Sequence, residues 1–367
     1  MAAAGSRLSS IPPPAASLEL APPRPSPCAP RGLGCAAGRG PKAPSPRAGP
    51  GIQSPWLAGP RFSLTRLVQR ARPRGRGPVL PGARRIKAYS LTAMTSVSHD
   101  RSKVDHYGAT YGQFAAEVYA LVRAQAFGED IGQTGWLTVD EQDLFISWLG
   151  LDRQRALLDV ACGSGRPTLR VARVIGCRVH GVDIHADAVK AARTQAQQTG
   201  LGDRAVFDQL DAGQPLPFPD GAFDAVMCVD AINHLPDRSR TLAEWRRILS
   251  PRGRLVFTDP IVVTGPLSNE EIAVRSSIGF FLFVPPGLDE ALLERVGFEL
   301  MAKADRTENM ARMAERWRAA REQQADELRR IEGDETFEGQ QRFFEVAARL
   351  ANERRLSRFA FCAQCPS

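Results

Sequence analysis

Short apolar segments alternate with amphipathic segments between residues 156 and 260, and this alternation limits the possible folds most strongly. The apolar segments have the length of strands, and the segments between them repeat with the period of helices. Near-continuous apolar strands separated by helices predict a parallel sheet covered on both faces, with ligands beyond the carboxyl ends of the strands. The predicted strands are 156–161, 177–183, 205–211, 223–230 and 254–260.

The pattern changes after the fifth strand. The sequence predicts a strand at 298–305, two long charged helices near 308–331 and 337–355, and a last strand in "LSRFAFCA". We therefore expect an α/β fold: a doubly wound, Rossmann-like, seven-stranded and mostly parallel sheet with a helical insert (308–355) before the last strand. The insert either caps the ligand site, which we favour, or forms a solvated surface hairpin. A helix is also expected over 105–126.

Residues 1–93 differ in composition from the rest of the chain. They contain 17 of the 28 prolines, and 15 lysines and arginines against one acid, Glu19. Such a segment cannot bury enough apolar surface to fold, so we predict disorder there and a folded domain over 94–367. The segment is either an organellar transit peptide or, as we favour, a leader without a function upstream of a translation start at Met94.

The charge balance excludes one class of partner. After residue 93 the chain carries 33 basic and 39 acidic residues, so this part is mildly acidic, the positive charge resides in the first segment, and a nucleic-acid partner is not expected. No stretch approaches the roughly 18 apolar residues of a membrane span. We expect a soluble, cytoplasmic chain, or an organellar one if residues 1–93 are a transit peptide. The "FCAQC" near the end lacks a second ligand pair, so no metal is expected.

The stretch "LLDVACGSGRPTLR" (157–170) joins the first predicted strand to the helix after it. A dinucleotide fingerprint would have a third glycine where Thr168 stands, and a phosphate loop would have a later GK[ST], which is absent. Asp159 would repel a pyrophosphate but suits a ligand with an ammonium group. The turn with Gly163 and Gly165 therefore predicts close approach to an adenosyl ligand with a cationic tail.

Two further acids stand at the ends of the next two predicted strands. Asp183 ends the second strand, where a carboxylate can accept hydrogen bonds from both ribose hydroxyls. Asp211 ends the third strand and can accept a hydrogen bond from the adenine amine. Each acid alone could be a helix cap, but three acids in order at successive strand ends indicate an adenosyl site.

These motifs resemble those of the class I S-adenosylmethionine-dependent methyltransferases over about residues 100–363. The resemblance is carried by "LLDVACGSG", "VDIHADAVKAAR", "DAGQPLPFPDGAFDAV", "DAINHLPDR" and "LAEWRRILSPRGRLVFTDP". It implies S-adenosyl-L-methionine as the cofactor. It assigns the methionine part to Asp159, Ala161, Gly163 and Gly165, the ribose to Asp183 with Ile184 beside the adenine, and the adenine amine to Asp211 with the Ala212 amide. Ala161 replaces the usual first glycine, and "SPRG" replaces a proline-glycine-glycine turn that we expect to be a surface turn.

The methyl acceptor is less constrained than the cofactor. The segment after the fourth strand reads "VDAINHLPD" and lacks the run typical of enzymes that methylate nucleic-acid bases, so a small-molecule acceptor is expected. "FGEDIGQTGWLT" and the helical insert loosely resemble the glycine, sarcosine and dimethylglycine N-methyltransferase group, which favours an amine nitrogen. The alternatives are O- or C-methylation of a natural product such as a polyketide or quinone, and a cofactor-binding module without catalysis.

Candidate acceptor-site residues lie on four segments. Asn233 and His234 follow the fourth strand, and His234 is either a general base for a hydroxyl or an ordered loop histidine. Tyr107 and Tyr111 either close over the sulfonium or form a core stripe. The remaining candidates are Arg166 or Arg275 for a substrate carboxylate, and the apolar "SSIGFFLFVPPG" (276–287) as a pocket wall.

Overall fold

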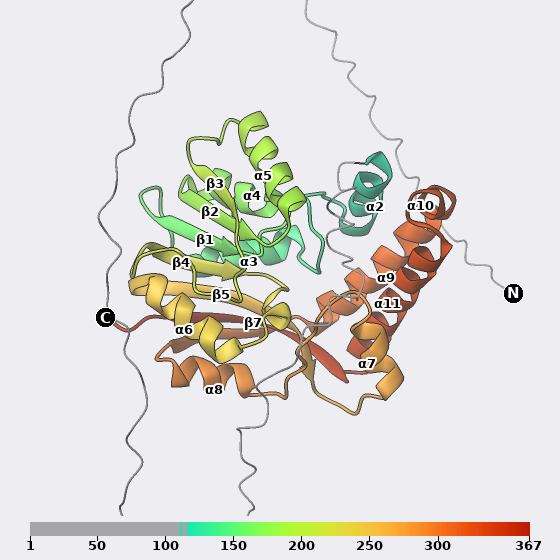
Figure 1. Cartoon of the computed structure of the whole chain (residues 1–367). Coiled ribbons are helices and arrows are strands. Elements are labelled where there is room, and N and C mark those ends of the chain that lie inside the picture. Colours follow the sequence, from blue (N-terminus) through green and yellow to red (C-terminus); the bar gives the residue numbers. More distant parts are fainter. Residues whose placement is uncertain (1–110, 112–115) are drawn as a thin grey trace, which may run out of the picture. The chain divides into compact units, whose positions relative to one another are not determined.

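The computed structural model describes Tyr111 and residues 116–367, and Figure 1 shows how their helices and strands are arranged. The predictions for residues 1–93, for a start at Met94 and for Tyr107 lie outside the described residues.

A seven-stranded sheet runs through the described domain (Figure 1). The strand order is β3-β2-β1-β4-β5-β7-β6, and the neighbours from β3 to β5 are parallel, whereas β7 is antiparallel to both β5 and β6. The strands are β1 (Ala156–Val160), β2 (Arg178–Asp183), β3 (Ala205–Gln209), β4 (Phe223–Cys228), β5 (Leu249–Val263), β6 (Glu299–Asp305) and β7 (Leu356–Gln364). The expected doubly wound, mostly parallel sheet is confirmed. Its strand order reverses between β1 and β4, and ligands bind at such a point.

Each face of the sheet has its own hydrophobic core, because successive side chains of a strand point to opposite faces. Leu157 of β1 packs with α3, α4 and α5, whereas Leu158 packs with α6 and α8. These helices are α3 (Val139–Leu149), α4 (Arg166–Ile175), α5 (Ala186–Gln198), α6 (Arg238–Ile248) and α8 (Leu288–Arg295). Covered on both faces, β1 and β4 are almost entirely buried and present only their carboxyl ends to a ligand.

The insert between β6 and β7 consists of three helices where the sequence predicts two. They are α9 (Thr307–Gln323), α10 (Ala325–Glu332) and α11 (Asp334–Asn352). The first predicted helix is interrupted at Gln324, and Gly333 separates α10 from α11. Aromatic and small side chains join α9 to α11, and Phe337 packs against α2 (Glu117–Phe127), which covers the last part of the helix expected at 105–126. Figure 1 shows the insert beyond one end of the sheet.

Two elements differ from the prediction. The strand β5 begins at Leu249 rather than 254, so "SPRG" lies within the strand as a bulged part of it and is not a separate surface turn. The helix α7 (Asn269–Arg275) stands where no helix is predicted. Its signal is a capping box: Ser268 accepts from the backbone N–H of Glu271, and the Glu271 carboxylate accepts from the backbone N–H of Ser268.

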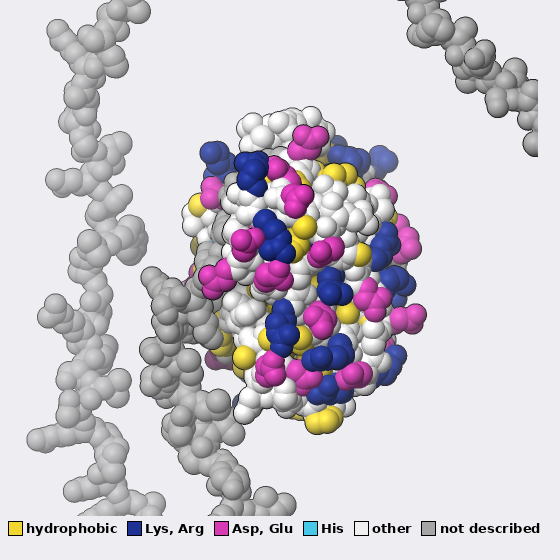
Figure 2. All heavy atoms as spheres, turned by 90° about the vertical axis from the view of Figure 1, so that its right-hand side faces the viewer, with side chains coloured by type: hydrophobic (Ala, Val, Ile, Leu, Met, Phe, Trp, Pro, Cys, Tyr) yellow, Lys and Arg dark blue, Asp and Glu magenta, His cyan; other side chains and the backbone are white. Residues whose placement is uncertain are grey.

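Figure 2 shows the face of the molecule that carries the insert, where basic and acidic side chains are interspersed. No patch of a single charge sign gathers on the described part of that face, in agreement with the charge balance of the sequence. Among the described residues, none of the helices combines the length and the apolar character that crossing a bilayer requires.

Candidate functional site

The turn from β1 to α4 is built around left-handed backbone conformations. The φ angles are 57° at Ala161, 56° at Gly163 and 73° at Gly165. Glycine adopts this region without strain, whereas a side chain disfavours it. A Cβ atom on Gly165 would also lie 2.5 Å from the Cβ of Ala192, so glycine is required there for close packing on α5. Ala161 adopts the same conformation with an exposed side chain and bears the backbone strain that glycine would avoid.

Asp159 lies buried beneath this turn. Its Oδ2 accepts a hydrogen bond of 2.5 Å from the Thr168 hydroxyl. Thr168, which stands where a dinucleotide fingerprint would have its third glycine, thus holds the Asp159 carboxylate in place. Burial, opposed by the hydrogen bond from Thr168 and assisted by the nearby charge of Asp183, raises the pKa of Asp159 to about 7. A buried carboxyl group with a raised pKa is suited to a cationic ligand, because a positive charge restores its ionised form.

Asp183 connects the end of β2 to the glycine turn. Its Oδ2 accepts from the backbone N–H of Gly163 (2.9 Å), and its Oδ1 accepts from the backbone N–H of His185 (2.9 Å). The neighbouring Ile184 is 54% exposed, which leaves an apolar surface at the strand end. Two of the predicted cofactor residues, Asp183 and Gly163, are thus in direct contact.

Asp211 and Ala212 follow the end of β3. The Asp211 carboxylate accepts from the backbone N–H of Gly213 (2.9 Å), which forms a local turn and leaves the side chain exposed. The backbone N–H of Leu210 donates to the carbonyl of Asp183, so this turn adjoins the end of β2. Acids at three neighbouring strand ends, a glycine turn and an exposed Ile184 fit an adenosyl group that carries an ammonium tail.

A loop before α3 lies on the outer side of the glycine turn. Arg166, a predicted substrate-carboxylate partner, instead binds Asp130 of this loop, with 2.9 Å between Nη1 and Oδ2. The Ser164 hydroxyl donates to the carbonyl of Gly132 (3.3 Å). Tyr111 is also close to the turn, because a Cβ on Gly163 would lie 2.5 Å from its hydroxyl oxygen. The loop over residues 130–136, which we call the cover loop, therefore rests on the turn.

Asn233 and His234 lie in a 3₁₀ turn (Ile232–His234) after β4, next to the end of β1. The Nδ1 atom of His234 lies 2.7 Å from the carbonyl oxygen of Phe280, and its Nε2 lies 3.2 Å from the Asn233 amide nitrogen. Because a carbonyl can only accept, Nδ1 carries the proton and Nε2 carries the lone pair. Burial lowers the pKa of His234 to about 4, so the ring is neutral at pH 7.

Two further features complete the acceptor side. The Asn233 Oδ1 atom is buried and has no hydrogen-bond partner among the described residues. Arg275, the other predicted carboxylate partner, is buried among aromatic rings, with its guanidinium carbon 4.3 Å from the centre of the Phe343 ring. The segment 276–287 supplies Phe280 and Phe281, and the ring of Phe281 packs edge-on against His234 at 4.7 Å.

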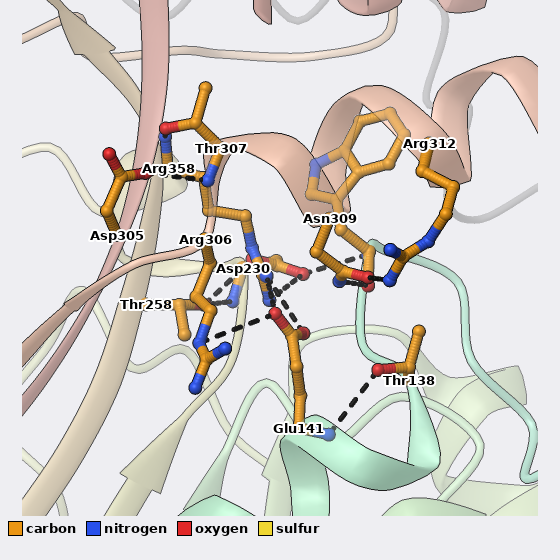
Figure 3. Close-up of polar contacts among 11 residues, drawn as sticks. Thr138, Glu141, Asp230, Thr258, Asp305, Arg306, Thr307, Asn309, Arg312 and Arg358 are labelled. Atoms are coloured by element: carbon orange, nitrogen blue, oxygen red, sulfur yellow. Dashed lines mark hydrogen bonds and ion pairs between the residues drawn. The ribbon is translucent and has the colours of Figure 1, made fainter.

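The sequence does not predict a buried ion cluster at the base of this site (Figure 3). In it, Arg358 of β7 lies between Asp230, which follows β4, and Glu141 of α3. The available signal is a lone arginine in the apolar strand "LSRFAFCA", because a charge buried in a covered sheet requires a partner. Among the described residues, no group of His, Cys, Asp or Glu side chains could hold a metal ion.

Comparisons with known proteins agree with this arrangement. A family described as "Methyltransferase domain" matches residues 158–257. The 27-O-demethylrifamycin SV methyltransferase of Amycolatopsis mediterranei is 31% identical over 223 residues, which are 56% of this chain and 82% of that protein. The ajmaline N-methyltransferase of Rauvolfia serpentina is 35% identical over 105 residues, which are 29% of this chain and about a third (36%) of that enzyme.

The fold has counterparts among solved structures. The phosphoethanolamine N-methyltransferase 2 of Haemonchus contortus, solved in complex with S-adenosyl-L-methionine, superposes with a TM-score of 0.61 and 18% identity. The match covers 72% of this chain and 61% of that one. At this identity the likeness concerns the fold alone, whereas the identity to the rifamycin enzyme extends over most of that protein. The chain therefore belongs to the class I S-adenosylmethionine-dependent methyltransferases.

Proposed function

We propose that this enzyme methylates a hydroxyl oxygen of an apolar small molecule, with His234 as the proton acceptor. The observation that carries the proposal is the orientation of the imidazole by the carbonyl of Phe280, which keeps the lone pair on Nε2. A hydroxyl must lose its proton as its oxygen gains a methyl group, so it benefits from a base that is neutral at pH 7. Burial lowers the pKa of His234 to about 4, which keeps the ring neutral at pH 7 and makes it a weaker base than an ordinary histidine, so its contribution rests on its position.

The strand ends would hold the cofactor, which supplies a methyl group already activated on a sulfonium. Asp159 pairs with the ammonium group and Asp183 accepts from the ribose hydroxyls. Asp211 and the Ala212 amide recognise the adenine, and Ile184 packs beside it. The left-handed turn brings backbone close to the ligand without side chains in between. With an activated donor, the remaining task of the protein is alignment and the exclusion of water.

The acceptor side is apolar and carries a few polar atoms. The Nε2 atom of His234 takes the hydroxyl proton once the acceptor hydroxyl replaces the Asn233 amide, which lies 3.2 Å from it. The orphaned Oδ1 of Asn233 accepts a hydrogen bond that orients the acceptor. The segment 276–287 walls the pocket, and the insert caps it by packing on Trp136 of the cover loop. Two observations support a bulky acceptor: the aromatic character of these walls and the rifamycin substrate in the name of the relative.

An amine nitrogen, which the sequence favours, is the second candidate. The ajmaline relative is named as an N-methyltransferase. A neutral amine already presents a lone pair, so it does not need His234 as a base.

The acceptor is identified by incubating the enzyme with labelled cofactor and fractionated metabolites, followed by mass analysis of the labelled product. The matched variants are His234→Asn and His180→Asn, since His180 lies on β2 beside Asp208, outside the site. On a hydroxyl acceptor, His234→Asn should lose at least about 100-fold in rate and recover as rising pH ionises the hydroxyl. His180→Asn should stay within about threefold. An unchanged rate and pH profile in His234→Asn would overturn O-methylation with this base.

A further inference from the structure

The guanidinium of Arg358 lies at the meeting point of three segments that form the site (Figure 3). We propose that Arg358 is a positioning residue: it holds the turn that carries His234 against the cover loop. This inference rests on the proposed function only for the role of His234 as a base. The guanidinium contacts Asp230 and Glu141, and Asp230 in turn contacts Trp136 of the cover loop.

Asp230 is the first contact and sets the direction of the chain after β4. Its φ angle is 55°, a left-handed conformation that a non-glycine residue adopts only when its surroundings enforce it. The backbone N–H of Asp230 donates to the Thr258 hydroxyl (2.7 Å), and that hydroxyl donates to Asp230 Oδ1 (2.7 Å). Arg358 adds Nε to Oδ1 at 2.7 Å and Nη2 to Oδ2 at 3.2 Å. The chain continues from Asp230 into the 3₁₀ turn that carries His234.

The same carboxylate holds the cover loop. Oδ2 of Asp230 accepts from the backbone N–H of Trp136 (2.9 Å). Gly135 packs so closely that a Cβ there would lie 2.8 Å from this oxygen. The other end of the cover loop rests on the glycine turn through Asp130 and Arg166. Asp230 therefore sets the separation between the glycine turn and the turn that carries His234.

Glu141 fixes the guanidinium from the other side. Its two carboxylate oxygens lie 2.8 and 2.9 Å from Nη1 of Arg358. The insert joins the cluster as well, because the backbone N–H of Arg358 donates to the Thr307 hydroxyl (3.1 Å) and Asn309 of α9 donates to the carbonyl of Trp136 (3.0 Å). One planar side chain thus connects β7 to α3 and to the turn after β4, and Asp230 extends the connection to the cover loop.

Stability alone is a weak reason for such a cluster. Burying three charges carries a desolvation cost that apolar side chains of the same volume would avoid, whereas directional hydrogen bonds fix one geometry. A guanidinium presents its donors in a rigid plane and can serve Asp230 and Glu141 at once. A lysine ammonium is a point charge and cannot hold both carboxylates in these directions.

The test compares Arg358→Lys with Arg321→Lys in the full chain. Arg321 is a matched control: it is also buried, pairs with Glu332 and lies at the end of α9 within the insert. Two readouts need no methyl acceptor. The first is hydrogen exchange of the backbone N–H groups of Trp136, His234 and Leu235. The second is the pKa of His234 by NMR, which is tractable because the chain has five histidines.

We expect exchange at these three amides to accelerate at least about tenfold in Arg358→Lys and to stay within about twofold in Arg321→Lys. The pKa of His234 should rise from about 4 toward its ordinary value in Arg358→Lys alone, because the loosened turn admits water. If Arg358→Lys does not fold, Asp230→Asn takes its place, since an amide has one acceptor oxygen for the contacts that two now receive.

The positioning role would be overturned if a folded Arg358 or Asp230 variant had the wild-type exchange rates at these amides and an unchanged His234 pKa. This outcome is independent of the chemistry at the acceptor. An N-methylated product from the wild-type enzyme would overturn the proposed role of His234 as a base and leave the exchange result standing.

Discussion

Asp159 is deeply buried, and the effect of burial, which favours the protonated form, outweighs the opposing effect of the hydrogen bond from Thr168. With a pKa of about 7, the carboxyl is half protonated near neutral pH when no cationic ligand is bound. A ligand ammonium group favours the ionised form, so binding must release the proton from Asp159 at low pH. Cofactor affinity is therefore linked to proton release at this one residue.

This linkage predicts that the dissociation constant of S-adenosylmethionine falls as pH rises to about 7 and rises again at alkaline pH, where the ligand's own amino group loses its proton. Below that pH the change should approach about tenfold per pH unit. Calorimetry from well below to well above neutral pH measures it. Asp159→Asn has no proton to release and should bind weakly at every pH without a slope. A wild-type affinity that is flat across this range would exclude the pairing of Asp159 with the ammonium group.

At the scale of elements, two glycines allow the cost of steric overlap to be distinguished from the cost of a left-handed backbone conformation. Gly165 and Gly200 have similar φ angles, 73° and 69°, but the space around them differs. A Cβ on Gly165 would lie 2.5 Å from Ala192 and 2.9 Å from Phe207, whereas a Cβ on Gly200 would meet no atom within 4 Å.

Gly200→Ala should cost only the backbone strain, about 1 kcal/mol in the free energy of unfolding. Gly165→Ala should cost about 3 kcal/mol, because the overlap with α5 is added. It should also weaken cofactor binding, since Gly165 is the N-cap residue of α4 and belongs to the glycine turn. Denaturant unfolding of the two variants gives the difference directly. Equal losses would mean that α5 moves aside without cost and that the contact with Ala192 is unimportant.

The elements that sequence reasoning identifies are those with a local signal. Strands β1 and β4 are near-continuous apolar runs, and the acids Asp159 and Asp183 stand at or next to the ends of β1 and β2, so the fold and the expected adenosyl site both have a local signal. The helix α7 has only a capping box as a signal and lacks apolar periodicity. The start of β5 at Leu249 depends on pairing with Phe223 of β4, which local propensity does not contain.

At the scale of the whole molecule, the contacts that hold the site together join distant parts of the chain. Arg358 and Glu141 are 217 positions apart, and Arg358 and Asp230 are 128 apart. Three-dimensional pairing of this kind leaves no pattern in a single sequence beyond an isolated charge in an apolar strand. The same holds for Arg166, where the sequence suggests a substrate contact and the structure pairs it with Asp130.

A second buried ion cluster connects α6, β5 and α8. Arg238 places Nη1 2.5 Å from Asp259 and 2.7 Å from Asp289, so two buried carboxyl groups share one guanidinium. Burial and the neighbouring Asp259 raise the pKa of Asp289 to about 7. The native state thus binds a proton more tightly than the unfolded chain does. Stability from this group is complete below about pH 4 and is lost as pH rises to about 7.

We therefore expect the free energy of unfolding of the wild type, relative to Asp289→Asn, to fall between about pH 5 and about pH 7. The loss should be on the order of 2 kcal/mol, because each unit of a pKa difference corresponds to about 1.4 kcal/mol. The amide introduced by Asp289→Asn imitates the protonated carboxyl group, so the variant should gain relative stability above neutral pH. The control Asp220→Asn removes an exposed carboxylate beside Arg247 and should show no such slope. If the free energy of unfolding of the wild type, relative to Asp289→Asn, rises with pH instead, then Asp289 is ionised in the folded protein and Arg238 stabilises its charge.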